Sequence, residues 1–200
     1  MKNRSKVIFV IIGLIIFWLG IILVKYYGSY WYDLYQSPWA YSQNTNEKLL
    51  VGKWKGDFTD PDGVKKYLDL TIIEPTTNEE RWEKAFTFKK RRRGISRNLN
   101  NIFDGTASVK SRLGVEEYTV SGHVIEDNYH QFSLHFSPVD EKKRILPNFT
   151  LFDSTPSSWQ NDEMNATLKF AYHKADGSSF WKSSDPKYSA KIACKLNKLL

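Results

Sequence analysis

The chain has 200 residues, with 29 Lys and Arg against 22 Asp and Glu, and a formal net charge of +7. It contains a single cysteine, Cys194, which excludes an intramolecular disulfide, so the folded part must be stabilised by its hydrophobic core. At this length, the part that follows an N-terminal anchor is large enough for one such core and too small for two.

An apolar run occupies residues 7–24, which are eighteen consecutive uncharged residues. Lys2, Arg4 and Lys6 precede the run, and Lys25 follows it. A helix of this length is about 27 Å long, which is close to the hydrocarbon thickness of a bilayer, about 30 Å. We therefore expect residues 1–25 to be a short cytoplasmic stub followed by one transmembrane helix.

The flanks of this run distinguish a permanent anchor from a cleaved signal peptide. Bulky residues such as Tyr26, Tyr27 and Trp31 stand where a cleavage site needs small ones, and no cysteine follows for lipid attachment. Basic residues stay on the cytoplasmic side, and more of them precede the run than follow it. The sequence predicts a single-pass protein of the inner (plasma) membrane, with a cytoplasmic N-terminus and an extracytoplasmic (periplasmic) C-terminal domain.

Aromatic residues are concentrated directly after the anchor, with eight of them between positions 26 and 41. Tyrosine and tryptophan favour the headgroup level of a bilayer, where their rings are apolar and their polar atoms reach water. We interpret residues 26–48 as an aromatic-rich juxtamembrane linker. The alternative is that these rings pack on the domain that follows.

Residues 49–200 show the period-two alternation of β-strands rather than helical spacing. Turn signals such as Asp60-Pro61-Asp62-Gly63 and Asp176-Gly177 separate the runs. Eight or nine successive strands that are apolar on one face remove their free edges best by closing, which predicts an antiparallel up-and-down β-barrel, with a β-sandwich as the alternative. The inward sets include Leu68, Leu70 and Ile72; Trp82, Phe86 and Phe88; Tyr118, Val120 and Val124; and Tyr188, Ala190, Ile192 and Cys194.

The first expected strand, within residues 49–58, contains Gly52-Lys53-Trp54. This resembles the Gly-x-Trp motif on the first strand of lipocalin-like (calycin) barrels. The resemblance implies that Trp54 plugs one end of the barrel and that Gly52, Trp54 and Gly56 are structural residues there. The chain is also similar, more weakly, to membrane-anchored β-barrel effectors of bacterial anti-phage systems, which sense cyclic nucleotides. Those effectors have a cytosolic barrel, whereas the charges here predict the opposite side.

Two groups of residues are candidates for contacts with a ligand or partner. The first is a basic run with five adjacent cations, which we expect to contact an anionic lipid, a glycan or an acidic protein; the predicted location disfavours nucleic acid. The second consists of rings outside the alternation, in loop-rich stretches expected at a barrel mouth. These residues are Lys89, Lys90, Arg91, Arg92 and Arg93, and Trp159, Phe180 and Trp181.

The sequence contains no motif for catalysis, a metal or a cofactor. The four histidines do not converge in the expected strand register, and no Gly-x-Ser-x-Gly or phosphate-binding loop occurs. We expect no enzyme activity, no metal and no cofactor. The sequence favours a membrane-anchored extracytoplasmic binding or interaction module of the cell envelope. The alternative is a cytosol-facing, membrane-tethered sensor or effector for a small ligand such as a cyclic nucleotide in anti-phage defence.

Overall fold

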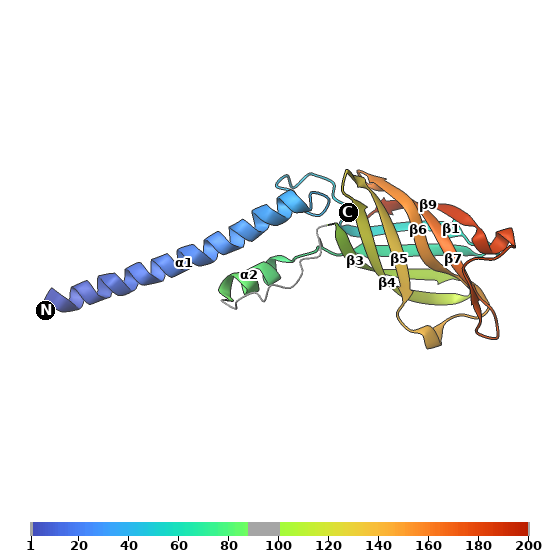
Figure 1. Cartoon of the computed structure of the whole chain (residues 1–200), viewed down its shortest axis with the longest axis horizontal. Helices are drawn as coiled ribbons and strands as arrows, with labels where there is room; N and C mark the ends of the chain where they lie inside the picture. Colours follow the sequence, from blue (N-terminus) through green and yellow to red (C-terminus); the bar gives the residue numbers. More distant parts are fainter. Residues whose placement is uncertain (1, 88–100, 200) are drawn as a thin grey trace. The chain divides into compact units, whose positions relative to one another are not determined.

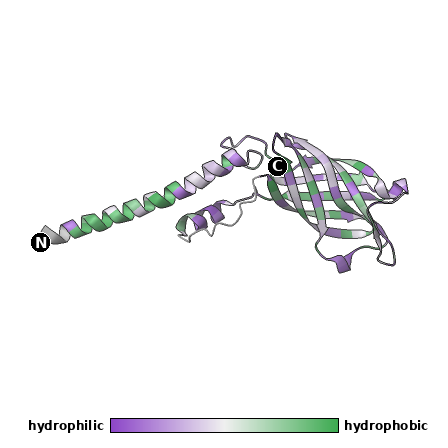
Figure 2. Cartoon of the chain, in the orientation of Figure 1, coloured by the Kyte–Doolittle hydropathy of each residue, from purple (hydrophilic) through white to green (hydrophobic). Residues whose placement is uncertain are grey.

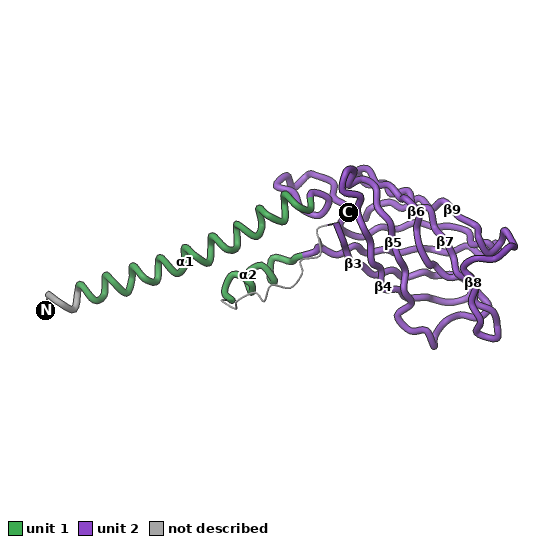
Figure 3. Tube along the Cα trace, viewed as in Figure 1, with its two compact units in different colours: residues 1–37, 76–100 green, residues 38–75, 101–200 purple. Residues whose placement is uncertain are grey.

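The computed structural model describes residues 2–87 and 101–199. The chain divides into two compact units, coloured separately in Figure 3. One contains residues 1–37 and 76–100, and the other contains residues 38–75 and 101–200. Residues 76–100 thus group with the N-terminal helix, although they fall inside the range 49–200 that the sequence predicts for the barrel.

The N-terminal helix α1 (Lys2–Gln36) is 35 residues long and contains the whole apolar run. Within the described residues, it is the one helix that is long and apolar enough to span a membrane. Figure 2 shows the hydrophobic stretch along this helix. The helix does not end near Lys25 but continues to Gln36, so the first part of the expected linker, residues 26–48, is helical.

A short second helix, α2 (Asn78–Phe86), lies where the alternation predicts a strand. The prediction that Trp82 and Phe86 belong to a strand is therefore wrong, and Phe88 lies outside the described residues. Thr77 and Glu80 form a complete capping box, in which each side chain accepts from the other's backbone N–H. This cap begins a helix, and Trp82, Ala85 and Phe86 then follow helical spacing.

The second unit is a closed antiparallel β-barrel of eight strands, which confirms the predicted fold class (Figure 1). Each strand from β1 to β7 pairs with the next, and β9 closes the barrel by pairing with both β7 and β1. A two-residue strand, β8 (Ser179–Phe180), pairs with β7 outside this cycle. The barrel strands are β1 (Gly52–Thr59), β2 (Lys65–Ile72), β3 (Ile102–Ser111), β4 (Gly114–Ile125), β5 (Asn128–Pro138), β6 (Asn148–Gln160), β7 (Glu163–His173) and β9 (Lys191–Lys198).

The predicted alternation places the core residues correctly in most strands. Leu68, Leu70 and Ile72 are all buried, and so are Tyr118, Val120 and Val124. The last strand begins at Lys191, later than predicted, because Tyr188 lies in a short 3-10 helix, η2 (Pro186–Ser189). A second 3-10 helix, η1 (Glu141–Lys143), lies between β5 and β6.

Gly122 in β4 is required by a close approach inside the barrel. A Cβ atom at this position would lie 2.1 Å from the ring of Phe103 on the neighbouring strand. The missing side chain therefore makes room for an aromatic ring in the core.

Because the strands alternate in direction, their connections fall at two ends of the barrel. We call one the junction end: it carries the connections β2–β3, β4–β5 and β6–β7 and the start of β1. We call the other the loop end: it carries the connections β1–β2, β3–β4 and β5–β6 and the long segment from β7 to β9. Residues 76–100 of the other unit fall in sequence within the β2–β3 connection, and α1 precedes β1.

Candidate functional site

The junction end is filled with aromatic rings. Trp54 is fully buried, and its indole Nε1 donates a hydrogen bond to the backbone oxygen of Leu50 at 2.8 Å. The ring of Phe103 lies 5.5 Å from that of Trp39 and 6.2 Å from that of Phe132, measured between centroids. Trp54 thus lies near one end of the barrel, two residues after Gly52 at the start of β1.

The loop end instead contains a buried ionic network inside the barrel. Lys66, at the start of β2, is 1% exposed, and its ammonium group lies between two carboxylates. Its Nζ atom is 3.4 Å from Asp60 Oδ2 and 3.6 Å from Glu116 Oε2. It also donates to Asn148 Oδ1 at 2.8 Å and to the backbone oxygen of Phe149. These contacts compensate the desolvation of a buried lysine.

The two carboxylates of this network are held differently. Asp60 Oδ1 accepts from the backbone N–H groups of Asp62 and Val64, both at 2.9 Å, so the β1–β2 turn fixes it. Glu116 Oε1 accepts from Asn148 Nδ2 at 3.0 Å. Burial raises the pKa of Glu116 above its usual range, an effect that the charge of Lys66 opposes.

A second series of polar contacts, separate from the Lys66 network, begins at Arg144 in the β5–β6 connection. Arg144 Nη1 lies 3.2 Å from His173 Nδ1, and His173 Nε2 lies 2.9 Å from Thr150 Oγ1. Burial, together with the charge of Arg144, lowers the pKa of His173 to about 4, so the ring is neutral at pH 7. Because arginine only donates, Nδ1 accepts and the proton sits on Nε2, which donates to Thr150.

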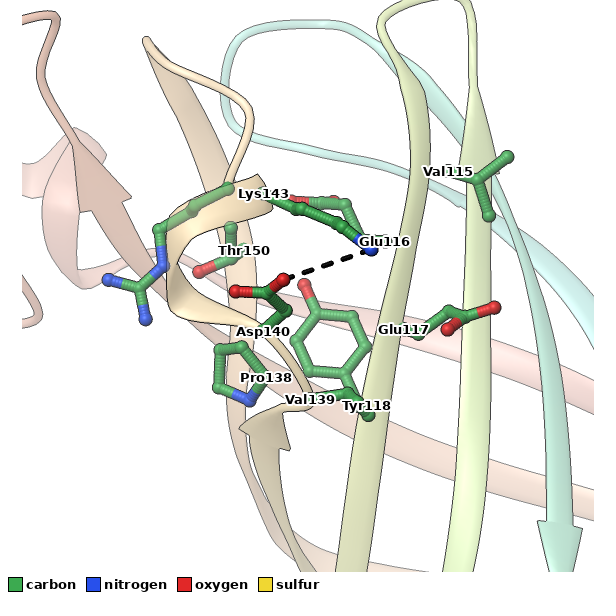
Figure 4. A pocket seen from close by; sticks show the side chains of 10 residues that line it. Val115, Glu116, Glu117, Tyr118, Pro138, Val139, Asp140, Lys143 and Thr150 are labelled. Atoms are coloured by element: carbon green, nitrogen blue, oxygen red, sulfur yellow. Dashed lines mark ion pairs between the residues drawn. The ribbon is translucent and has the colours of Figure 1, made fainter.

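Three of these polar groups, those of Glu116, Arg144 and Thr150, border a cavity of about 290 Å³ at the loop end, shown in Figure 4. Strands β4 and β6 contribute Glu116, Tyr118 and Thr150, and the β5–β6 connection contributes Arg144 and an ion pair, Asp140–Lys143, of 3.8 Å. Burial raises the pKa of Tyr118, so its phenol stays protonated and can donate. A second cavity, of about 300 Å³, shares Arg144 and Thr150 and is also lined by His173 and Trp181.

The residues predicted from the sequence as contact sites are distributed over different places. Lys89, Lys90, Arg91, Arg92 and Arg93 lie outside the described residues. Phe180 lies in β8 and Trp181 directly follows it at the loop end, where Trp181 is 63% exposed and stacks on Phe152.

Trp159 does not lie in a barrel-mouth loop, because β6 continues to Gln160. Its side chain is buried at the junction end, where Nε1 donates to the backbone oxygen of Tyr129 at 3.0 Å. It lines a cavity of about 650 Å³ together with His130. The structure therefore separates Trp159 from Phe180 and Trp181.

The loop-end network was not among the residues predicted from the sequence. A signal for it was present, because Lys66 and Glu116 occupy inward positions of the alternation that otherwise hold apolar residues. In the described residues, no group of three or more His, Cys, Asp or Glu side chains is arranged to hold a metal ion.

No family model matches the chain, and no curated protein matches it. Among solved structures, the chain is similar to a de novo designed fluorescence-activating beta barrel, with 10% sequence identity and a TM-score of 0.42. The similarity covers 75% of this chain and 94% of the designed one.

Proposed function

We propose that this protein is a membrane-anchored, extracytoplasmic binding module of the cell envelope, and that its lipocalin-like barrel binds a small polar ligand at the loop end. The observation that carries this proposal is the cavity bordered by the buried groups of Glu116, Tyr118 and Thr150. Concave sites with a few convergent polar groups are the usual form of small-molecule sites in proteins.

The contrast between the barrel ends supports this assignment. Ionic groups inside a barrel contribute little net stability, because their desolvation offsets their attraction. Rings fill the junction end without that cost, so stability alone does not account for Lys66 and Glu116 at the loop end. Ligand binding does account for them, because Glu116 lines the cavity and Lys66, which lines neither cavity, holds that carboxylate in place from behind.

Arg144 gives the site a further donor. Its Nε atom is buried and has no hydrogen-bond partner among the described residues, and its side chain lines both loop-end cavities. A ligand oxygen that accepts from this guanidinium would satisfy it. At about 290 and 300 Å³, the two cavities are at the lower end of the range for ligand sites, so the ligand is small.

We infer binding rather than catalysis from the groups that line the first cavity. Glu116 is engaged by Lys66 and Asn148. The hydroxyl of Thr150 faces the protonated Nε2 of His173, which cannot accept its proton. The arrangement therefore lacks an activated nucleophile. An activity abolished by Glu116→Gln with the fold intact would contradict this inference.

The binding experiment uses the full chain in detergent and a panel of nucleotides, amino acids and short saccharides, read out by the shift of the thermal unfolding midpoint. A compound that binds at the loop end should lose its shift in Arg144→Met and keep it in Arg112→Met. Arg112 is a matched control because it is exposed in the β3–β4 turn at the same end and lines neither cavity. Equal shifts in both variants would place the site elsewhere.

The orientation is tested separately with topology reporters fused at the C-terminus. An extracytoplasmic signal would support the envelope module. A cytoplasmic signal would overturn that part of the proposal and favour the cyclic-nucleotide sensor, for which the nucleotides in the panel are the test.

A further inference from the structure

The helix α2 packs along α1 at the level where the apolar run of α1 ends. Both helices belong to the same compact unit, shown in Figure 3. The ring of Trp82 stacks on that of Tyr26, with centroids 4.2 Å apart and an interplanar angle of 20°. The ring of Phe86 lies 6.3 Å from that of Trp18. Because the later residue of α2 contacts the earlier residue of α1, α2 runs back along α1 toward the apolar run.

The contact between Phe86 and Trp18 shows how far α2 reaches along the apolar run of α1. Trp18 precedes Lys25, the first charge after the apolar run, by seven residues. At 1.5 Å per residue, this places Trp18 about 10 Å inside the apolar run. If α1 spans the membrane, as the proposed function requires, Phe86 lies on the hydrocarbon side of Lys25, beside Trp18, and therefore within the bilayer. Lys25 Nζ donates to the backbone oxygen of Thr87 at 3.4 Å, which links the two helices at this level.

A buried ionic contact holds α2 in this position. Arg81 is 2% exposed, and its Nε donates to Asp33 Oδ2 at 3.1 Å. Its guanidinium carbon lies 5.5 Å from the centroid of the Tyr30 ring, and Nη1 donates to Asn78 Oδ1 at 2.9 Å. Ala85, one turn further along α2, is buried as well. One face of α2, including Arg81 and Ala85, is thus turned toward α1.

Trp82 and Phe86 lie next to this buried face, and these residues are 39% and 52% exposed. On the opposite side of the helix are charged residues such as Lys84, which is exposed. Trp82, at the level of Tyr26, matches the interfacial aromatic belt of membrane proteins, and Phe86 lies deeper, beside Trp18. The side of α2 that carries Trp82 and Phe86 adjoins α1 at Tyr26 and at Trp18 of the apolar run.

We propose that α2 is an interfacial membrane helix that inserts Trp82 and Phe86 between lipid acyl chains beside α1. The protein then contacts the bilayer through two segments far apart in sequence rather than through one helix. Because α2 lies in the connection between β2 and β3, this second contact tethers the barrel to the membrane at a second point of the chain.

The test is the accessibility of nitroxide labels in the full chain, reconstituted in phospholipid nanodiscs, with Cys194→Ala as background. Labels are placed at Phe86→Cys, at Lys84→Cys as the control on the opposite side of α2, and at Phe9→Cys within the apolar run. The label at position 86 should be reached by dissolved oxygen and protected from a water-soluble nickel chelate, with an oxygen-to-nickel ratio several-fold above that at position 84.

The other outcomes separate the possible failures. A label at 86 that is as accessible to nickel as that at 84 would place α2 in water. A label protected from both reagents would show that protein covers this side, and either result would overturn the proposal. If the label at position 9 is also accessible to nickel, the anchor itself fails, which contradicts the proposed function and not α2 alone.

A second measurement leaves Phe86 in place. In vesicles of lipids brominated near the headgroup end of the acyl chain, Trp82 should be among the quenched tryptophans, so Trp82→Phe should reduce the quenched fraction of the total fluorescence. The positioning variant Arg81→Ala should reduce it too, because α2 is released from Asp33. No change in the quenched fraction in Trp82→Phe would contradict insertion.

Discussion

The two ends of the barrel solve the same problem in opposite ways. At the junction end, Trp54, Phe103 and Phe132 close the interior with rings, and the polar atom of Trp54 finds a backbone partner. At the loop end, Lys66 and Glu116 occupy equivalent inward positions and are satisfied by each other and by Asn148. The alternation along a strand therefore specifies which side chains face the interior, but not whether the interior is apolar or polar.

The largest loss of stability should come from removing a buried ring at the junction end. Trp54→Ala should lower the free energy of unfolding by about 3–5 kcal/mol, because it removes a fully buried ring and leaves a cavity. Denaturant unfolding of the full chain in detergent measures this loss. Trp181→Ala is the control: it removes a ring that is 63% exposed and should cost about 0.5 kcal/mol or less. Similar losses in both variants would mean that Trp54 does not plug the barrel.

Removing the cation of the loop-end network should lower the free energy of unfolding somewhat less. Lys66→Met leaves Asp60 and Glu116 buried without their cation, and we expect a loss of about 3 kcal/mol. The double variant Lys66→Met with Glu116→Gln removes one of the uncompensated charges and should recover part of that stability in the same unfolding assay. If the second substitution recovers nothing, Glu116 and Lys66 are not energetically coupled.

A third effect is a pH dependence of the stability, which we expect from His173 at the loop end. The pKa of His173 is 6.5 in the unfolded chain and is lowered to about 4 in the folded protein. The unfolded state therefore binds more protons between these values, so the stability that the neutral ring contributes is complete above pH 6.5 and is lost as the pH falls toward 4. Unfolding midpoints measured across this window should fall less steeply in His173→Gln than in the unmodified chain. Parallel curves would contradict the pKa shift.

The smallest expected effect concerns Cys194 in β9, between the two ends. Burial raises the pKa of this thiol to about 12, and its Sγ lies 3.6 Å from the backbone oxygen of Asp57. A thiol reagent at pH 8 should react with it much more slowly in the folded protein than after denaturation. Cys194→Ala should cost about 1 kcal/mol, as expected for a small buried side chain. Rapid labelling of the folded protein would show that the barrel opens near β9.

The barrel could be predicted from the sequence because its signal is local and repeated. Inward residues such as Leu68 and Leu70 recur with period two, and turns such as that at Asp60 separate the strands. The helix α2 was missed because Trp82 and Phe86 also fit an alternation of even positions. The capping box formed by Thr77 and Glu80 was the competing signal, and it specified the helix.

The candidate site was less predictable, for a different reason. Lys66 and Glu116 could be placed inside from their positions in the strands, but their contact joins β2 to β4 across the interior. Arg144 belongs to a connection without periodicity, so its approach to His173 follows from tertiary packing alone. Rings such as Trp159 looked like loop residues because Pro156 and the serines around it hide the length of β6.

The pairing of β9 with β1 has a consequence for biogenesis. Until β9 is added, β1 and β7 are open edges that can pair with another chain. About 140 residues separate the end of β1 from the end of β9, which at 5–20 residues per second corresponds to roughly 7–28 s of synthesis. During that interval the nascent chain is exposed to aggregation. A protein of this topology therefore depends on whatever shields unfinished sheets while its last strand is made.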